Sequence, residues 1–428
     1  MEQQGNKVDM KLRWAVLPLL VMIGVMLVAI VKLEQGPHIP LIVGTAVASL
    51  VAWRHGYKWK EIEEMMYKGI RLALPAVVII ILVSLTIGAW IGGGVVATMI
   101  YYGLTIISPA YFLVTICIIC SVVALSIGSS WSTMGTIGVA GMGIGLSMGI
   151  PAPMVAGAVI SGAYFGDKMS PLSDTTNLAA GLTHTNLFEH IRHMLYTTIP
   201  GLVIALGARK VPAIPALVVG ITLGFLAQVI VQGGSLADSV GALQSGYVID
   251  TGNELVDNLF SRGGLDAMMY TVSMTIVGIT FGGILEYSGM LQSIMNQIVK
   301  LAKTAGSMIA STILAGVATN ATCSEQYISI VVPSRMFAGA YEKMGLQSKS
   351  LSRALEDGGT LTSVFIPWNT CGVFILGTLG VGAFEYAPYA ILNFIVPVIS
   401  IIYAFTGFTI ARIAVQSVEP PLEKQAAQ

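Results

Sequence analysis

Charged side chains are scarce in this chain. They make up 10% of its 428 residues, whereas an ordinary soluble domain carries about 25%. Several apolar runs approach or reach the roughly 20 residues needed to cross a hydrocarbon core, and no amphipathic surface alternates with them. These runs are residues 14–31, 74–90, 111–127, 211–231 and 389–411. The sequence therefore predicts a polytopic membrane protein rather than a soluble helical one.

Other absences narrow the class of protein further. Successive ten-residue alternating segments, typical of a β-barrel, are missing, so we expect an all-α fold. The net charge is zero, which argues against a nucleic-acid partner. The chain has no H-E-x-x-H motif and no soluble domain, so we expect no enzyme, no catalytic residue and no cofactor. The C-x-x-C of Cys117 and Cys120 lacks a βαβ context, and we expect it to serve helix packing.

The positive charges near the first two expected spans predict the orientation. Lys7, Lys11 and Arg13 precede the first span, and five basic residues within residues 54–71 follow the second, which is expected at 39–53. Lysine and arginine favour the cytoplasmic side, so both flanks, and the N-terminus, are expected there. The first run is long enough to span and lacks a small-residue cleavage pattern, so we interpret it as an uncleaved helix.

The apolar pattern predicts helices at about 14–33, 39–53, 69–90, 94–107 and 110–127, with an interfacial amphipathic stretch at 58–68. A small polar segment at 128–133 and a glycine-rich run to Gly149 follow. Irregular backbone at membrane depth survives only against protein or a water-filled cavity, so this segment suits a re-entrant hairpin. Small-residue helix packing is the alternative explanation for the glycines.

A broken helix comes next. Apolar sequence from residue 160 runs into two aspartates, Pro171 and a hydroxyl cluster before apolar sequence resumes at Leu178. Proline removes a backbone donor and biases the preceding residue away from helix. Further spans are expected at 192–208 and 211–231, joined by a tight turn at Arg209 and Lys210, and residues 235–262 form a polar loop with an interfacial helix.

The second half of the chain repeats this order. Helices at about 265–285 and 304–318 lead to a polar interruption at 319–325, and a second helix is interrupted around Pro367. Gly162 and Gly358, Pro171 and Pro367, and Gly181 and Gly377 are each 196 positions apart, and the hairpins pair with Ser132 over Ser324. Paired interruptions in corresponding halves indicate a transporter site at the repeat interface. If the halves are inverted, each contains an odd number of crossings.

These features divide the chain into five parts. They are a cytoplasmic N-terminus (1–13), a first membrane repeat (14–208), a connecting helix and polar loop (209–264), a second membrane repeat (265–412) and a C-terminal tail (413–428).

Asp167 and Asp174 flank the first break and are the leading ion-binding candidates, since charges at membrane depth are costly and usually functional. Hydroxyl and amide groups beside them could supply the remaining oxygens of a Na⁺ site: Ser170, Ser173, Thr175, Thr176 and Asn177. One aspartate could exchange a proton for Na⁺. The alternative is structural, with Asp167 paired to Lys168 and Asp174 as N-cap of the following half-helix.

The second break offers Asn369 and Thr370, while Asp357 lies nearly three turns earlier and is expected to cap its helix. Thr319, Asn320, Thr322 and Glu325 from the second hairpin could complete a site. Glu325 is a third candidate for proton coupling, against a structural interaction with a residue such as Arg335. The cluster of His184, His190 and His193 could switch with pH, although a solvated loop or helix end fits it equally well.

Two motifs carry a resemblance to a known family. Gly128-Ser-Ser-Trp-Ser-Thr-Met-Gly-Thr136 and Gly162-Ala-Tyr-Phe-Gly-Asp-Lys-Met-Ser-Pro-Leu-Ser-Asp-Thr-Thr-Asn177 resemble the NhaC family of Na⁺/H⁺ antiporters, and the likeness covers nearly the whole chain. The family is bacterial and includes relatives that exchange organic acids such as malate and lactate, and some amino-acid transporters. The resemblance implies an inner-membrane protein with two inverted repeats, whose transport domain moves like an elevator against a scaffold, in a homodimer.

The same resemblance assigns roles to individual residues. It implies ion binding by Asp167, Ser173, Asp174, Thr175, Asn177, Asn369 and Thr370, with Na⁺ at Asp174, Thr175 and Asn369. It also implies that the hairpin tips face the substrate through Ser129, Ser130, Asn320 and Thr322. One departure is the connection at 207–211, which is shorter than the family pattern leads one to expect.

The leading hypothesis is an alternating-access Na⁺/H⁺ antiporter in which the two cations compete for carboxylates at the first break. The alternative is a Na⁺- or H⁺-coupled organic-acid or amino-acid exchanger, in which the hairpin hydroxyls and amides hold the organic solute. A passive channel is disfavoured because no ring of selectivity residues is visible.

Overall fold

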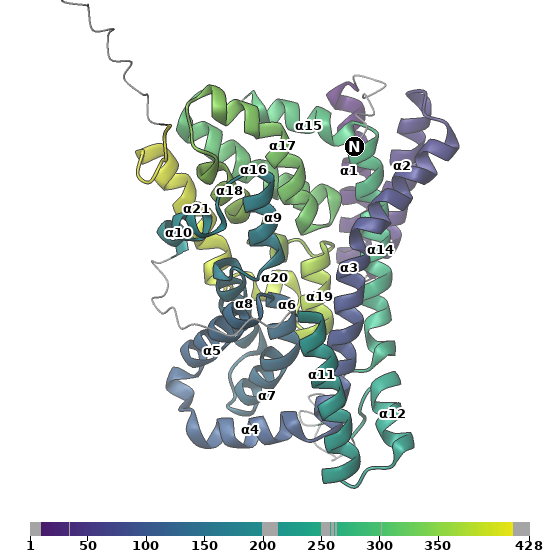
Figure 1. Cartoon of the computed structure of the whole chain (residues 1–428). Coiled ribbons are helices and arrows are strands. Elements are labelled where there is room, and N and C mark those ends of the chain that lie inside the picture. Colours follow the sequence, from purple (N-terminus) through teal and green to yellow (C-terminus); the bar gives the residue numbers. More distant parts are fainter. Residues whose placement is uncertain are drawn as a thin grey trace, which may run out of the picture.

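The computed structural model describes residues 10–33, 35–198, 213–249, 257, 261, 263–300 and 302–413. Apart from an isolated bridge between Leu346 and Arg412, the described residues form helices and the turns that join them. The expected all-α fold is confirmed for these residues. In Figure 1, the N-terminal helices and two long helices lie together along one side, and the other helices pack beside them.

Within the described ranges, three helices are long and apolar enough to cross a membrane: α3 (Trp59–Gly92), the stretch Pro109–Ile127 that contains α5 (Phe112–Ile127), and α14 (Leu265–Tyr287). A fourth span exists if the bent pair Ser348–Phe365 and Thr370–Leu379, which meets at 47°, is counted as one. Five shorter apolar helices accompany them. The protein is therefore a multi-pass membrane protein, since single helices of this length and composition bury themselves in lipid or in one another.

Helices α1 (Leu12–Leu27), α2 (His38–Arg54), α3 and α14 form the group along one side. Close approach of α3 and α14 depends on Gly69 and Gly283, because a Cβ on Gly69 would lie 2.7 Å from the carbonyl oxygen of Ile279. The expected interfacial stretch at 58–68 is not a separate element. It is the first part of α3, which runs unbroken for 34 residues. No turn separates the stretch at 58–68 from the helix expected at 69–90.

Helices α5 and α8 (Ala152–Met169) form the centre of the second group, with α4 (Val95–Ile106) and α7 (Val139–Ser147) beside them. Gly162 and Gly166 of α8 lie directly against the backbone carbonyls of Cys117 and Ser121. Small residues let two helix backbones approach in this way. The C-x-x-C segment is therefore a packing surface, and all four cysteines are free thiols.

The glycine-rich run is helical. After α5 ends at Gly128, the chain forms α6 (Ser130–Thr133), a π-helical turn (Met134–Gly138) and α7. Gly141 packs against Ile116 and Gly145 against Val155, each at a distance that leaves no room for a side chain. Small-residue packing thus accounts for these glycines, and the re-entrant course of the segment stays a prediction.

Both expected helix breaks are present. The first lies between α8 and α9 (Asp174–Leu182), with Pro171 in the gap. The second separates α18 (Ser348–Leu355), its π-helical continuation η5 (Glu356–Thr360) and a short 3₁₀ turn (Ser363–Phe365) from α19 (Thr370–Leu379), with Pro367 in the gap. Proline in each gap removes the backbone donor that a continuous helix would need.

Two pairs of residues that lie 196 positions apart share a backbone conformation. Gly128 and Ser324 both adopt left-handed conformations, with φ of 74° and 57°. Ser173 and Asn369 are both extended N-caps, with φ of −67° and −74°. The expected pairing of Ser132 with Ser324 is wrong, because the left-handed residue that ends the preceding helix is Gly128 in one half and Ser324 in the other.

The second interruption is shorter than expected. Helix α16 (Ala305–Cys323) continues through Thr319 and Asn320, and only Ser324 and Glu325 separate it from α17 (Gln326–Lys343). An unexpected short helix, α15 (Met290–Val299), precedes it. The remaining described α-helices are α10 (Leu187–Thr198), α11 (Ala213–Leu226), α12 (Leu236–Gln244), α20 (Ala383–Tyr386) and α21 (Ile391–Thr406). The expected tight turn at Arg209 and Lys210 lies outside the described residues.

Candidate functional site

A small cavity lies where the first break meets two turns, one at Gly128 and Ser129 before α6 and the other at Ser324 and Glu325 before α17. Its volume is about 30 Å³, which is enough for roughly one water-sized occupant. Polar residues from the start of α6, the end of α8, the start of α9 and the start of α17 dominate its lining. They are Ser129, Ser130, Asp167, Ser173, Asp174, Thr175, Gln326 and Tyr327, with Gly128, Trp131, Ala76 and Ile79 completing the wall.

Asp167 is the most enclosed carboxylate of this cavity, with a side chain 5% exposed. It stands in the last turn of α8, and its Oδ2 accepts a hydrogen bond of 2.7 Å from the Ser130 hydroxyl. The Ser130 backbone amide and the Ser173 side chain also interact with it. Asp167 is therefore held by donors from both sides of the cavity, with hydroxyl oxygens beside it.

The start of α9 supplies the opposite wall. Ser173 is the N-cap, and its hydroxyl accepts from the Thr176 amide at 3.4 Å and lies 3.1 Å from the Thr175 hydroxyl. The alternative role of Asp174 as N-cap is thus wrong, because Asp174 is the first residue inside the helix. Its carboxylate is more exposed than that of Asp167 and interacts with the Tyr327 side chain. Asp174 stands at the mouth of the cavity and Asp167 at its closed end.

Asn177 has a different position. Its side-chain amide donates to the carbonyl oxygens of Pro171 at 2.9 Å and Ser173 at 2.7 Å. The Ser173 carbonyl also accepts the backbone amide of Asn177, whereas the Pro171 carbonyl lies in the break, where an unpaired backbone group away from water is costly. Asn177 therefore closes the break and does not line the cavity.

The residues of the second break form a neighbouring cluster. The Asn369 amide donates to the Asn320 carbonyl oxygen and to its Oδ1, both at 3.2 Å, and the Asn320 amide donates to the Gly359 carbonyl at 2.6 Å. Thr370 donates to Glu325 Oε1 at 3.4 Å. The cluster locks α16, α17 and α19 together, and Asn369 does not reach the cavity that Asp174 and Thr175 line.

Glu325 is fully enclosed, and its Oε2 accepts from the backbone amides of Tyr327 at 2.5 Å and Ile328 at 3.3 Å. It is the N-cap of α17. The suggested interaction with Arg335 is wrong, because Arg335 is exposed and lines a separate cavity of about 620 Å³ together with Glu286. Thr322 turns its hydroxyl back to the Thr319 carbonyl at 3.3 Å and also stays out of the small cavity.

Two lining residues, Gln326 and Tyr327, were not expected from the sequence. Gln326 and Tyr327 lie 196 positions after Ser130 and Trp131. Pairing the two halves at 196 positions in this region, instead of 192, would have indicated both as lining residues. Gln326 also joins the two clusters, since its Oε1 accepts from the Cys371 thiol at 3.0 Å and the Ser363 hydroxyl at 3.3 Å. The cavity thus takes equivalent residues from both halves.

The pairing of Asp167 with Lys168 is also wrong. Lys168 forms a fully buried ion pair with Asp357, which therefore does not cap its helix. His190 and His193 are buried, at 0% and 5% exposed, and do not lie in a solvated loop, whereas His184 is exposed. His190 bonds the Ser352 hydroxyl at 2.7 Å.

The sequence is similar along most of its length to transporters of one group. The sequence model of the Na⁺/H⁺ antiporter family matches residues 162–207 and 201–408. The Na⁺/H⁺ antiporter NhaC of Alkalihalophilus pseudofirmus is 36% identical, over 92% of this chain and 96% of the relative. The malate-2H⁺/Na⁺-lactate antiporter of Bacillus subtilis is 35% identical (91% and 94%), and the arginine/ornithine antiporter ArcD of Halobacterium salinarum is 33% identical (92% of each). The chain belongs to the Na⁺/H⁺ antiporter family.

Proposed function

We propose that this protein is a secondary Na⁺/H⁺ antiporter of the bacterial inner membrane, with its N-terminus in the cytoplasm, and that Na⁺ binds in the cavity lined by Asp167. The observation that carries the proposal is the match between the cavity and a dehydrated ion. A volume of about 30 Å³ is enclosed by two carboxylates and several hydroxyl groups. Hard cations prefer such oxygen ligands.

The ligands we assign are Asp167, Ser130, Ser173 and Thr175, with Asp174 at the mouth. Asp167 supplies the negative charge, and the hydroxyls of Ser130 and Thr175 can turn their lone pairs toward a cation. Ser129, the N-cap of α6, lines the cavity beside them. Asn320, Asn369, Thr370 and Asn177 position the broken helices around this site.

The relatives that exchange malate, lactate, arginine or ornithine suggest an organic solute as the alternative cargo. Pockets for small organic ligands measure roughly 300–1,000 Å³, about ten to thirty times the volume of about 30 Å³ found beside Asp167. The geometry therefore favours a cation over an organic acid as the occupant of this site.

Alternating access follows from the repeated backbone. We assign the stretch from α3 to α10 and the stretch from α14 to α21 as two inverted repeats, each with a re-entrant segment at its chain reversal. The matching conformations of Gly128 and Ser324, and of Ser173 and Asn369, support this assignment. The group of α1, α2, α3 and α14 would be the scaffold against which the broken helices move. Transporters with such repeats carry their sites where the halves meet.

The test is proton flux in proteoliposomes with an internal pH dye. NaCl is added alone to one sample, and with malate, lactate, arginine or ornithine on either side in others, with KCl as the control salt. The proposal requires proton movement on adding NaCl alone and none with KCl. Proton movement that needs an organic solute would replace the proposal by the exchanger.

A further inference from the structure

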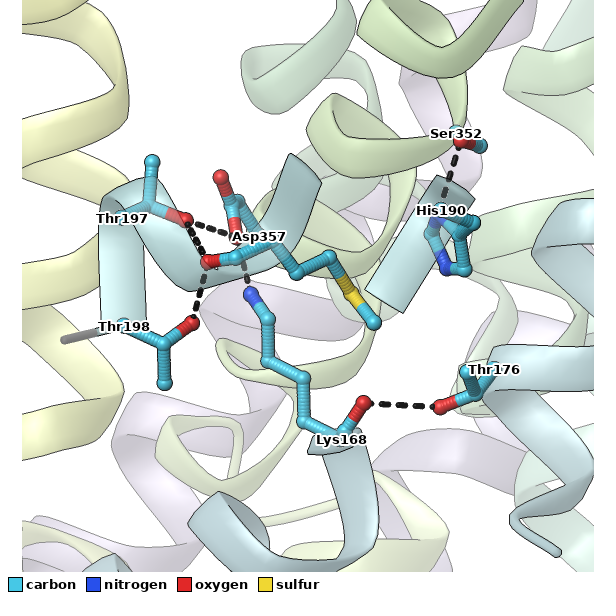
Figure 2. Close-up of polar contacts among 8 residues, drawn as sticks. Lys168, Thr176, His190, Thr197, Thr198, Ser352 and Asp357 are labelled. Atoms are coloured by element: carbon cyan, nitrogen blue, oxygen red, sulfur yellow. Dashed lines mark hydrogen bonds and ion pairs between the residues drawn. The ribbon is translucent and has the colours of Figure 1, made fainter. Parts of the chain in front are cut away.

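A second buried charge cluster lies between the end of α8 and η5. Lys168, the neighbour of Asp167, forms an ion pair with Oδ1 of Asp357 in η5, and both side chains are fully buried. The hydroxyl of Thr197 in α10 donates to the same oxygen at 3.5 Å. Figure 2 shows Lys168 reaching from the end of α8 to Asp357, with Thr197 beside it.

Glu356 is the unusual member of this cluster. It is fully buried, and neither of its carboxyl oxygens has a hydrogen-bond partner among the described residues. The Thr360 hydroxyl, one turn later, interacts with it without meeting hydrogen-bond geometry. The charged groups that act on it are Lys168 and Asp167 from α8 and Asp357 from its own segment. An ionised carboxylate without hydrogen bonds is costly in a protein interior, and neutralising it removes the cost.

The other ionisable groups around η5 balance part of this charge. Arg353 of α18 is fully buried, donates to the Thr409 hydroxyl at 2.9 Å and interacts with Asp357. His190 and His193 of α10 lie near the cations Lys168 and Arg353, respectively, so we count both rings as neutral. Tyr341 of α17 and Tyr403 of α21 face Arg353 and are counted as neutral phenols.

The formal charges of the α8–η5 cluster, defined as Asp167, Lys168, Arg353, Glu356 and Asp357, leave one negative charge in excess. The cluster contains three carboxylates and two cations, and every member is buried. One monovalent cation brings the set to neutrality. Either a Na⁺ at Asp167 or a proton on Glu356 meets this requirement, and both together would leave a positive charge in excess.

We propose that Glu356 is the proton-binding site of the transporter, distinct from the Na⁺ site at Asp167. This inference rests on the proposed function and deepens it. Na⁺ arriving at Asp167 cancels the charge that favours a proton on Glu356, and the proton leaves. A proton bound at Glu356 removes the charge that favours Na⁺. The two cations thus exclude each other without sharing an oxygen, and Lys168, whose backbone carbonyl accepts from Thr176 at 3.1 Å across the break, joins the two sites.

The test is the pH dependence of Na⁺ binding to the purified protein in detergent, measured by calorimetry with NaCl. Competition with one proton makes the Kd for Na⁺ of the wild type rise about tenfold for each unit of pH decrease in the acid range. The variant Glu356→Gln, which keeps the shape and removes the proton site, should bind Na⁺ more weakly at high pH and with a Kd that no longer changes with pH.

Two further variants complete the design. Glu286→Gln, at a half-buried carboxyl with one unpartnered oxygen, should keep the pH dependence of the wild type. Glu356→Asp should keep a pH dependence with a shifted midpoint, because its shorter side chain moves the carboxyl relative to the charges around it. If Glu356→Gln does not fold, Glu356→Asp alone tests the proposal. A pH midpoint of Na⁺ binding equal to that of the wild type would then contradict it.

If the Kd for Na⁺ of Glu356→Gln changed with pH as steeply as that of the wild type, the proposal would be overturned. The proton would then be placed on Asp167 itself. The proposal would also be overturned if Glu286→Gln lost the pH dependence of its Kd for Na⁺, because the loss would then not be specific to the α8–η5 cluster. Failure of the wild type to bind Na⁺ at any pH would refute the proposed function and not this inference alone.

Discussion

Ser129 and Glu325 occupy the same place in the two halves of the molecule. They are 196 residues apart, each follows a left-handed residue, and their φ angles are −152° and −148°. Each side chain caps the helix that follows. One half therefore presents a hydroxyl and the other a carboxylate at the equivalent position, which makes the candidate site asymmetric although the backbone repeats.

Replacement of Glu325 should separate its capping role from a role in coupling. Glu325→Ala removes the acceptor for two backbone amides and should lower the free energy of unfolding by about 1–2 kcal/mol. Glu325→Gln keeps one acceptor and should cost less. Thermal unfolding in detergent measures both, and Na⁺-driven proton flux is recorded beside it. A stable Glu325→Gln variant without proton flux would show that Glu325 carries the proton, contrary to our assignment.

The buried Lys168–Asp357 pair should show strong coupling. Lys168→Met leaves the Asp357 carboxylate buried without its partner, which costs about 3–5 kcal/mol. The double variant Lys168→Met with Asp357→Asn should recover most of this loss, since the Asp357 charge is removed together with that of its partner. Unfolding of the two single variants and the double variant forms the cycle. Additive losses would mean that the two side chains do not interact in the folded protein.

The close contact of α5 and α8 should make Gly162 intolerant of any side chain. A Cβ there would meet the Cys117 backbone, whose Cα lies 3.0 Å away, and backbone atoms cannot move aside without separating the helices. Gly162→Ala should therefore lower the melting temperature. Gly181→Ala is the matched control, because nothing lies within 4 Å of its added methyl group, and this change should be neutral or stabilising by about 0.5–1 kcal/mol. Equal behaviour of the two variants would contradict the packing described here.

Tyr327 should tune the site without being essential. Its side chain interacts with Asp174 at the mouth of the cavity, so Tyr327→Phe removes a polar neighbour of that carboxylate and leaves the ring in place. We expect a change in Na⁺ affinity of only a few fold, measured by calorimetry. Complete loss of Na⁺ binding would mean that the phenol is a ligand.

The sequence predicts the helical class and both broken helices, because apolar length and Pro171 and Pro367 act locally. It also indicates Asp167, Ser130, Ser173, Asp174 and Thr175, which the structure brings around one cavity. These five are close in two short motifs, so local sequence was sufficient to group them.

The contributions of Gln326, Tyr327 and Glu356 could not be predicted in this way. Gln326 and Tyr327 reach the cavity only through the packing of the second half against the first, and an error of four residues in the repeat register concealed them. The Lys168–Asp357 pair joins residues 189 positions apart, and no local pattern distinguishes it from a pairing of Lys168 with the adjacent Asp167.

The central claim is that Asp167 holds the transported Na⁺. Binding of radioactive Na⁺ to the purified protein tests it most directly, with Asp167→Asn compared with Asp238→Asn, the same change at an exposed residue of α12. The account predicts that Asp167→Asn loses saturable Na⁺ binding at any pH while Asp238→Asn binds as the wild type does. Wild-type Na⁺ affinity in a folded Asp167→Asn protein would contradict the account.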